Sequence, residues 1–339
     1  MLNHNKRRIT LRNATFVLQS GVLLPDVEIA FDTYGELVTN RSNVVLVLHA
    51  LTGWPSAHEW WGGLIGEGKL LDPAQHFILC PNLLGSCYGS TGPESINPKT
   101  GTGYLASFPE ITPRDMAKAI LSLLDELDIV DVQLAIGGSL GGMVILELAS
   151  LASDRFCAIV PIAVSGSQSA WRIAFGSTVR KTITSFDPTL KDRDKLKKGL
   201  WLARQFAMTT YRSSIEFNER FGRELIGDKF QVETYLEHQG DKIVERFSPY
   251  SYLTLARAME LYELPHSLPD MQALFVGVSS DVVYDTNEIA AFAARFPRGE
   301  YQTLVALHGH DSFLIDTEAL TEIVKPFVER VTLREERVA

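Results

Sequence analysis

The sequence has few cysteines, no long apolar run and no excess of basic residues. Its three cysteines, Cys80, Cys87 and Cys157, form no C-x-x-C pair, which argues against a disulfide framework and against a zinc knuckle. No stretch reaches the roughly 18 apolar residues that a membrane helix needs, and the polar, basic N-terminal segment lacks the apolar core of a signal peptide. We therefore expect a cytoplasmic protein with reduced thiols.

Charge and composition narrow the range of partners. The formal net charge is −9, from 32 Lys and Arg against 41 Asp and Glu, and no dense basic stripe offsets it. Because such a surface repels phosphate backbones, we expect small-molecule partners and no nucleic acid. With 45% hydrophobic and 22% charged residues, the 339-residue chain is able to bury a sizeable core. One domain with an insertion is expected, since α/β folds often reach this length.

Short apolar runs separated by helical segments predict an α/β fold, with a mostly parallel sheet covered by helices on both faces. The run VVLVL at Val44–Leu48 is typical of a strand buried on both faces, because every position is apolar. The segment Thr112–Leu127 has helical spacing, with Pro113 in the first turn. The predicted strands are 44–48, 77–80, 132–136, 157–163, 273–278 and 301–307.

The alternation of strands and helices stops between residues 166 and 265. Charged, helix-favouring stretches take its place, at 191–211 and 213–225. We expect residues 1–165 and 266–339 to form the core domain and residues 166–265 to form a helical lid over the carboxyl ends of the strands. A long loop at 84–108, rich in Gly, Ser, Thr, Asn and Pro, is expected to be functional because of its length.

Residues Gly137–Gly141 spell G-x-S-x-G between a predicted strand and a predicted helix at 142–151. In this context the motif indicates the nucleophile elbow of an α/β-hydrolase fold, with Ser139 as the nucleophile on a strained turn. The amide of Leu140 is expected to donate to a developing oxyanion, and the amide of Leu51, in the loop after 44–48, to be the second donor. The alternative is a glycine-rich turn in which Ser139 only caps the helix.

The acid and the base should follow Ser139 in the chain, each after a late strand. Asp281 lies just past the strand that ends at Val278, while Asp285 is a rival four residues further on. His308 and His310 both follow the last predicted strand, and spacing alone does not choose between them. The residues therefore indicate a Ser-Asp-His triad with one position open.

Longer segments resemble the homoserine O-acetyltransferase family over nearly the whole chain. The resemblance implies an acyl-CoA-dependent O-acyltransferase of methionine biosynthesis, which acetylates L-homoserine through an acyl-serine in a ping-pong mechanism. It implies an acyl-CoA co-substrate with no bound cofactor or metal, and a homodimer. The segments are HALTG (49–53), GLIGEGKLLD (63–72), NLLGSCYGSTGP (82–93), INPKTG (96–101), GGSLGGM (137–143), YLEHQGDK (235–242) and GHDSFL (309–314).

The same resemblance implies particular site residues. It points to His310 as the base, in the segment Gly309–Asp311, and to Asp281 as the acid. It also implies that Arg204 and Tyr211 line the pocket and that Asp311 and Thr52 face the amino acid. These roles agree with physical expectation: seven residues are about two helical turns, so the first pair shares a face, and a guanidinium suits a carboxylate.

Two departures from the family pattern and several rivals remain open. Leu140 replaces a usual methionine, and Val282–Asp285 replace a segment that usually holds an aromatic residue and then proline. The acyl donor could therefore be succinyl rather than acetyl, and the acceptor serine rather than homoserine. An esterase or thioesterase with the same triad is a further rival, as is a ligand-binding protein. The segment Gly63–Lys69 fits G-x-x-x-x-G-K, but Leu70 replaces the required Ser or Thr.

Overall fold

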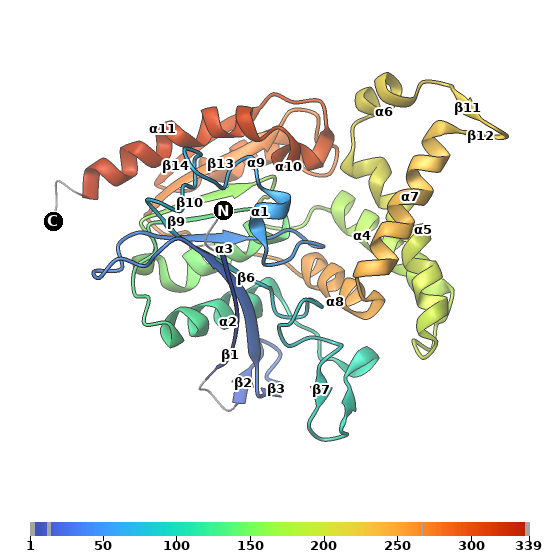
Figure 1. Ribbon diagram of the computed structural model, residues 1–339, viewed down its shortest axis with the longest axis horizontal. Helices are drawn as coiled ribbons and strands as arrows, with labels where there is room; N and C mark the ends of the chain where they lie inside the picture. The colour runs from blue at the N-terminus through green and yellow to red at the C-terminus, as the bar shows by residue number, and fades with distance from the viewer. Residues whose placement is uncertain (1–3, 12–14, 266, 336–339) are drawn as a thin grey trace.

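The computed structural model describes residues 4–11, 15–265 and 267–335, and these residues contain an eight-stranded sheet (Figure 1). Its order is β1-β4-β6-β5-β9-β10-β13-β14. The strands from β6 to β14 are parallel, whereas β4 is antiparallel to both of its neighbours. The strands are β1 His4–Thr10, β4 Glu28–Tyr34, β5 Val44–Leu48, β6 Phe77–Pro81, β9 Leu134–Gly138, β10 Ala158–Ile162, β13 Gln272–Val278 and β14 Arg298–Leu304.

Helices cover both faces of this sheet, which explains why the central strands are apolar throughout. In β5, Val44, Leu46 and Leu48 pack in one core cluster with helices α2 (Pro113–Glu126), α3 (Leu140–Ala152) and α9 (Thr286–Ala293). Val45 and Val47 point to the opposite face and pack in a second cluster with α11 (Thr317–Glu335). The predicted α/β fold with a mostly parallel sheet is confirmed.

The predicted elements agree with the structure to within a few residues. Helix α2 begins at Pro113, and Thr112 and Asp115 form a capping box at its N-terminus. The strand expected at 132–136 is shifted to Leu134–Gly138, because Gly137 and Gly138 pair with β10. The last strand is Arg298–Leu304 rather than 301–307, since it pairs with β13 in that register. Helix α3 begins at Leu140, directly after the serine, and not at residue 142.

The antiparallel pair β1 and β4 was not predicted. Strand β1, HNKRRIT, is an exposed polar edge strand without an apolar pattern, so its sequence carries no strand signal of the buried kind. The remaining short elements of the core are β2 Thr15–Val17, β3 Leu23–Pro25, α1 Ala57–Trp60, β7 Ile96–Asn97, β8 Thr102–Gly103, η1 Leu105–Ser107, η2 Ser153–Arg155, η3 Gly309–Asp311 and α10 Ser312–Ile315.

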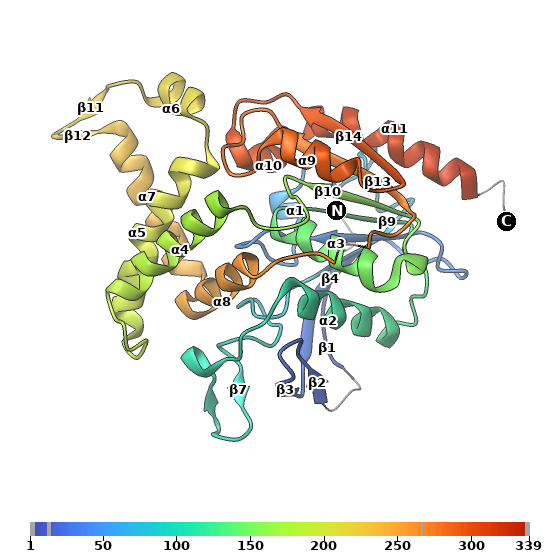
Figure 2. The same ribbon diagram turned by 180° about the vertical axis from the view of Figure 1, so that it is seen from behind.

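A helical region lies on one side of the sheet, where Figures 1 and 2 show α4 to α8 as a group beside the core. It falls within the predicted lid, although the domain boundaries stay a prediction and residue 266 lies outside the described residues. Its elements are α4 Ala170–Ser185, α5 Arg193–Tyr211, α6 Ser214–Phe221, β11 Leu225–Ile226, β12 Lys229–Phe230, α7 Gln231–Arg246 and α8 Pro249–Glu260. Among all described helices, none is both long enough and apolar enough to cross a bilayer.

Candidate active site

Ser139 occupies a strained turn between β9 and α3. Its φ is 54° and its ψ −119°, a backbone conformation that L residues rarely adopt. The surrounding structure imposes it, because the Ser139 amide donates to the carbonyl oxygen of Ile162 at 2.9 Å. The side chain does not cap α3, so the alternative of a helix-capping serine has no support in the geometry.

Two glycines of the motif permit this turn by their lack of a side chain. A Cβ on Gly141 would overlap the backbone carbonyl oxygen of Leu48, and one on Gly138 would overlap the ring of Phe313. Strand β5, helix α3 and the segment after η3 therefore approach the serine more closely than any larger residue would allow.

Asp281 and His310 form a buried hydrogen-bonded pair. Nδ1 of His310 lies 2.6 Å from Oδ2 of Asp281, and the side chains are 7% and 0% exposed, respectively. Oδ1 of Asp281 accepts the amides of Val283 and Tyr284 at 2.7 and 3.1 Å. These amides hold the carboxylate in place. The hydrogen bond to Asp281 occupies Nδ1 of His310, so Nε2 is the ring nitrogen left for the serine.

Several groups act on the pKa of His310. Burial by itself lowers this pKa, but the charge and the hydrogen bond of Asp281, together with the charge of Asp311, raise it above its ordinary value of 6.5. Arg172 acts in the opposite direction. The balance gives an imidazole that binds a proton more tightly than a free histidine.

The rival residues have other partners. Asp285 accepts the amides of Asn287 and Glu288 and so caps α9. Nδ1 of His308 contacts the carboxylate of Asp316 at 2.9 Å. The structure therefore brings Asp281 and His310 together and places Asp285 and His308 in separate interactions.

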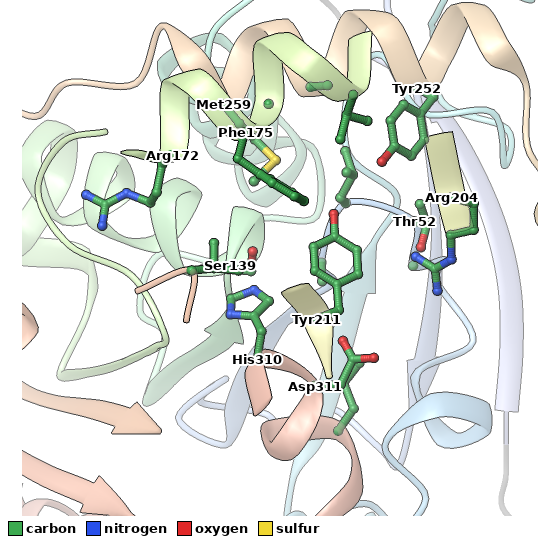
Figure 3. Close-up of a pocket in the computed structure, with 18 of the residues that line it drawn as sticks. Thr52, Ser139, Arg172, Phe175, Arg204, Tyr211, Tyr252, Met259, His310 and Asp311 are labelled. Atoms are coloured by element: carbon green, nitrogen blue, oxygen red, sulfur yellow. The ribbon is translucent and has the colours of Figure 1, made fainter. Parts of the chain in front are cut away.

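Ser139 and His310 line a single pocket of about 210 Å³ between the sheet and the helical region. Figure 3 shows the imidazole of His310 beside Ser139, with aromatic and apolar side chains above them. Its walls come from the loop after β5, the helices α4, α5 and α8, and the segment 309–314. The lining residues include Leu51, Thr52, Trp60, Arg172, Phe175, Arg204, Tyr211, Arg246, Tyr252, Met259, Tyr284 and Asp311.

The loop that carries Leu51 is fixed from beneath by His49. This histidine is fully buried, its Nδ1 contacts the Ala50 carbonyl at 2.8 Å, and its Nε2 accepts the amide of Leu83 at 3.1 Å. Burial lowers its pKa to about 4, so it stays neutral with the proton on Nδ1. Neither the Leu51 nor the Leu140 amide has an acceptor among the described residues, which leaves both available to an oxyanion.

Arg204 and Tyr211 share a face of α5, as predicted, with the guanidinium 5.5 Å from the ring centroid. Among the described residues, Arg204 has no salt-bridge partner. Asp311 is partnered by Nε of Arg212 at 3.2 Å. Burial raises the pKa of Asp311, and the charges of Arg204, Arg212 and His310 oppose this effect.

Sequence reasoning missed other arginines in or near this site. Arg246, at the end of α7, donates to the Thr52 carbonyl at 2.7 Å and to the Tyr88 hydroxyl at 2.8 Å. Arg212 follows Tyr211 directly, but no motif marks its partner in the distant Asp311. Since each of these arginines pairs with a group far away in the chain, spacing carries no signal for them.

Two neighbouring tryptophans have different surroundings. Trp61 is fully buried in the core and donates to the Phe313 carbonyl at 2.7 Å, whereas Trp60 lines the pocket. Within the described residues no group of three or more His, Cys, Asp or Glu side chains has the arrangement of a metal site.

Known proteins resemble this chain in sequence and in structure. The sequence model of the alpha/beta hydrolase fold family matches residues 43–317. A homoserine O-acetyltransferase of Trichormus variabilis is 42% identical over 334 residues, which are 94% of this chain and 93% of the relative.

Two crystal structures share the fold. A homoserine O-acetyltransferase from Bacillus anthracis has a TM-score of 0.87 at 22% identity, over 97% of this chain and 98% of that one. Esterase E22 has a TM-score of 0.87 at 20% identity, over 96% of this chain and 100% of that one.

If the Asp281–His310 pair activates Ser139, Asp281→Asn should slow acylation of Ser139 by p-nitrophenyl acetate by about 10³- to 10⁴-fold, because the imidazole loses its proper tautomer. In the parent, the rate should fall as the pH drops through a midpoint above 6.5, since a raised pKa keeps His310 protonated to higher pH. Stopped-flow release of nitrophenol measures both. Asp285→Asn is the control, because Asn caps a helix as well as Asp does; equal losses in the two variants would contradict the assignment.

Proposed function

The chain belongs to the homoserine O-acetyltransferase family of α/β-hydrolase-fold acyltransferases, and from this premise we propose that it transfers an acetyl group from acetyl-CoA to the side-chain hydroxyl of L-homoserine. One observation carries the proposal beyond kinship. The pocket of Ser139 and His310 also contains a cation without a salt bridge among the described residues, Arg204, and a partly buried carboxylate, Asp311, which already pairs with Arg212; the signs of Arg204 and Asp311 match the two charges of a free amino acid.

The first half of the proposed reaction forms an acyl-serine. His310 Nε2 takes the proton of the Ser139 hydroxyl, whose oxygen attacks the thioester carbonyl carbon of the acyl-CoA. The amides of Leu51 and Leu140 stabilise the oxyanion. When the C–S bond breaks, His310 returns the proton to the departing thiolate.

The second half transfers the acyl group to the acceptor. His310 takes the proton of the homoserine hydroxyl, whose oxygen attacks the ester carbon of the acyl-serine. The C–O bond to Ser139 breaks and the proton passes to the serine oxygen, which regenerates the enzyme. The same imidazole thus serves as base and then acid in each half of the proposed ping-pong mechanism.

Water competes with homoserine for the acyl-serine. It is some four to five decades more concentrated than a millimolar acceptor, so the site must favour homoserine by about 6 kcal/mol of activation free energy. Phe175, Tyr252 and Met259 give the pocket an apolar wall on the helical side (Figure 3). Exclusion of water by this wall, together with the oriented acceptor, is the proposed source of the preference.

The acceptor is proposed to lie between Arg204 and Asp311. Figure 3 shows Arg204 and Thr52 on the side of Tyr211 that is away from Arg172, and Asp311 below Tyr211. Arg204 would hold the carboxylate by charge-assisted hydrogen bonds, and Asp311 would hold the ammonium group. Homoserine is one carbon longer than serine, so the position of this pair relative to Ser139 would select the acceptor.

An esterase is the second candidate, because esterase E22 shares the fold over almost the whole chain. A succinyl donor and a serine acceptor are variants of the first candidate. When an acyl-CoA is the acyl donor, each of these enzymes would release CoA, but only a transferase needs an amino acid for rapid turnover.

Release of free thiol from acetyl-CoA or succinyl-CoA should therefore separate these functions. With acetyl-CoA we expect release to rise at least tenfold on addition of homoserine and much less on addition of serine, with O-acetylhomoserine identified by mass spectrometry. Release that ignores both amino acids would identify a hydrolase, and faster release from succinyl-CoA would reassign the donor. Ser139→Ala provides the background rate.

Replacement of Arg204 should weaken the acceptor specifically. Arg204→Met should lower kcat/KM for homoserine by about 10- to 100-fold, since a hydrogen bond to a charged group is worth about 1.5–3 kcal/mol, while acylation of Ser139 in the absence of acceptor stays near the parent rate. Lys198→Met, an exposed change on the same helix, is the control. A proportional loss in both half-reactions would contradict acceptor binding.

A homodimer is proposed as well, through the outer face of the helical region. Helices α5 and α6 and strand β11 of this region expose large apolar side chains that a partner could cover: Leu202, Phe206, Ile215, Leu225 and Ile226. Light scattering after gel filtration should give twice the 37.7 kDa mass of the chain. The double substitution Leu225→Asp and Ile226→Asp should shift it to the monomer; a monomeric parent would refute the proposal.

A further inference from the structure

The imidazole of His310 is enclosed by aromatic rings. Tyr284 stacks on it with the centroids 5.5 Å apart and the planes 19° apart. Phe313 meets its edge at 5.7 Å and 82°, and Tyr211 lies at 5.9 Å. A hydrogen bond from Nδ1 to Asp281 fixes one atom of the ring, but a stacked neighbour is needed to fix its plane.

A buried guanidinium lies against the Tyr284 ring. The Cζ atom of Arg172 is 4.3 Å from the ring centroid, and the arginine side chain is 4% exposed. Glu288 accepts from both terminal nitrogens, at 2.6 and 3.0 Å, and Gln168 accepts from Nε at 2.9 Å. Gln168 in turn donates to the Tyr284 hydroxyl at 3.1 Å, so the arginine and the tyrosine are held as one unit.

The members of this unit come from different parts of the fold. Tyr284 lies in the loop between β13 and α9, three residues after Asp281, and Glu288 lies on α9 of the core. Arg172 lies in the first turn of α4, where the helical region begins. Figure 3 shows Arg172 on the side of Ser139 and His310 that is away from Arg204, with its guanidinium pointing away from the centre of the pocket.

We propose that Tyr284 and Arg172 are positioning residues for His310: the stacked column His310–Tyr284–Arg172, anchored by Glu288, fixes the plane of the base and couples it to the first helix of the lid. The inference rests on the proposed function only in taking His310 as the base of Ser139. It is independent of the acyl donor and of the acceptor.

The column also sets the charge around the base. Asp281 and Asp311 face His310 with negative charge, and Arg172 faces it with positive charge that Glu288 partly neutralises. The neighbouring hydroxyls of Tyr211 and Tyr284 stay protonated, because burial raises the pKa of each. Removing Arg172 should therefore make His310 harder to deprotonate, whereas removing the charge of Glu288 should make it easier.

Labelling of Ser139 by a fluorophosphonate, followed from pH 5 to 9, tests the proposal. It reports how well His310 activates Ser139 and needs neither acyl-CoA nor an amino acid. Loss of labelling in Ser139→Ala sets the background. If the labelling behaves as expected but homoserine is not acetylated, the proposed function fails and this inference stands.

Tyr284→Leu should slow labelling at the optimal pH by about 3- to 10-fold, and Tyr284→Phe, which keeps the ring, should restore most of the rate. Arg172→Met should move the acidic midpoint of the pH profile up by several tenths of a unit, and Glu288→Gln should move it down. A purely structural role would not produce shifts of opposite sign.

Arg330→Met is the matched control. Arg330 lies 5.7 Å from the ring of Phe327 and pairs with both oxygens of Glu300 at 2.6 and 2.7 Å, so it also has an aromatic and a carboxylate partner, but on the exposed surface of α11. Its pH profile should be that of the parent. Parent-like labelling in Tyr284→Leu would overturn the proposal. So would acidic midpoints of the pH profile that move in the same direction in Arg172→Met and Glu288→Gln. If Arg172→Met does not fold, Glu288→Gln still provides the test.

Discussion

The buried hydrogen bond between Asp281 and His310 is the interaction on which the site depends. It joins the ends of two neighbouring parallel strands, since Asp281 follows β13 and His310 follows β14. The sheet order thus determines the partner, and the amides of Val283 and Tyr284 hold the carboxylate in place. The surrounding rings and charges then adjust the imidazole that this bond has already located.

The nucleophile depends on a second constraint, the close approach of three elements. Ser139 keeps its unfavourable φ because β10 binds its amide and because Gly138 and Gly141 let Phe313 and the Leu48 carbonyl come near. The serine and the imidazole therefore reach one pocket from separate strands. The rigid sheet thus fixes the positions of both side chains at the carboxyl ends of its strands.

The sequence predicted the parts of the protein that follow local rules. Strand β5 is apolar at every position, Pro113 marks the first turn of α2, and the G-x-S-x-G motif sits between a strand and a helix, so each signal lies within a few residues. Choosing His310 over His308 required family resemblance, because only the fold shows that His308 pairs with Asp316. Arg172 and Arg246 were not predicted, since their partners, Glu288 and Thr52, are more than a hundred residues away in the chain.

Arg246 joins the helical region to the loop that carries Leu51. It reaches from the end of α7 to the carbonyl of Thr52, one residue beyond the expected oxyanion donor Leu51, and its guanidinium lies 5.0 Å from the Trp54 ring. The helical region is thus hydrogen-bonded to the loop that carries the expected oxyanion donor. Replacing the helical region with that of a relative would therefore change the support of this loop as well as the walls of the pocket. Such an exchange requires that the contact between Arg246 and Thr52 be kept.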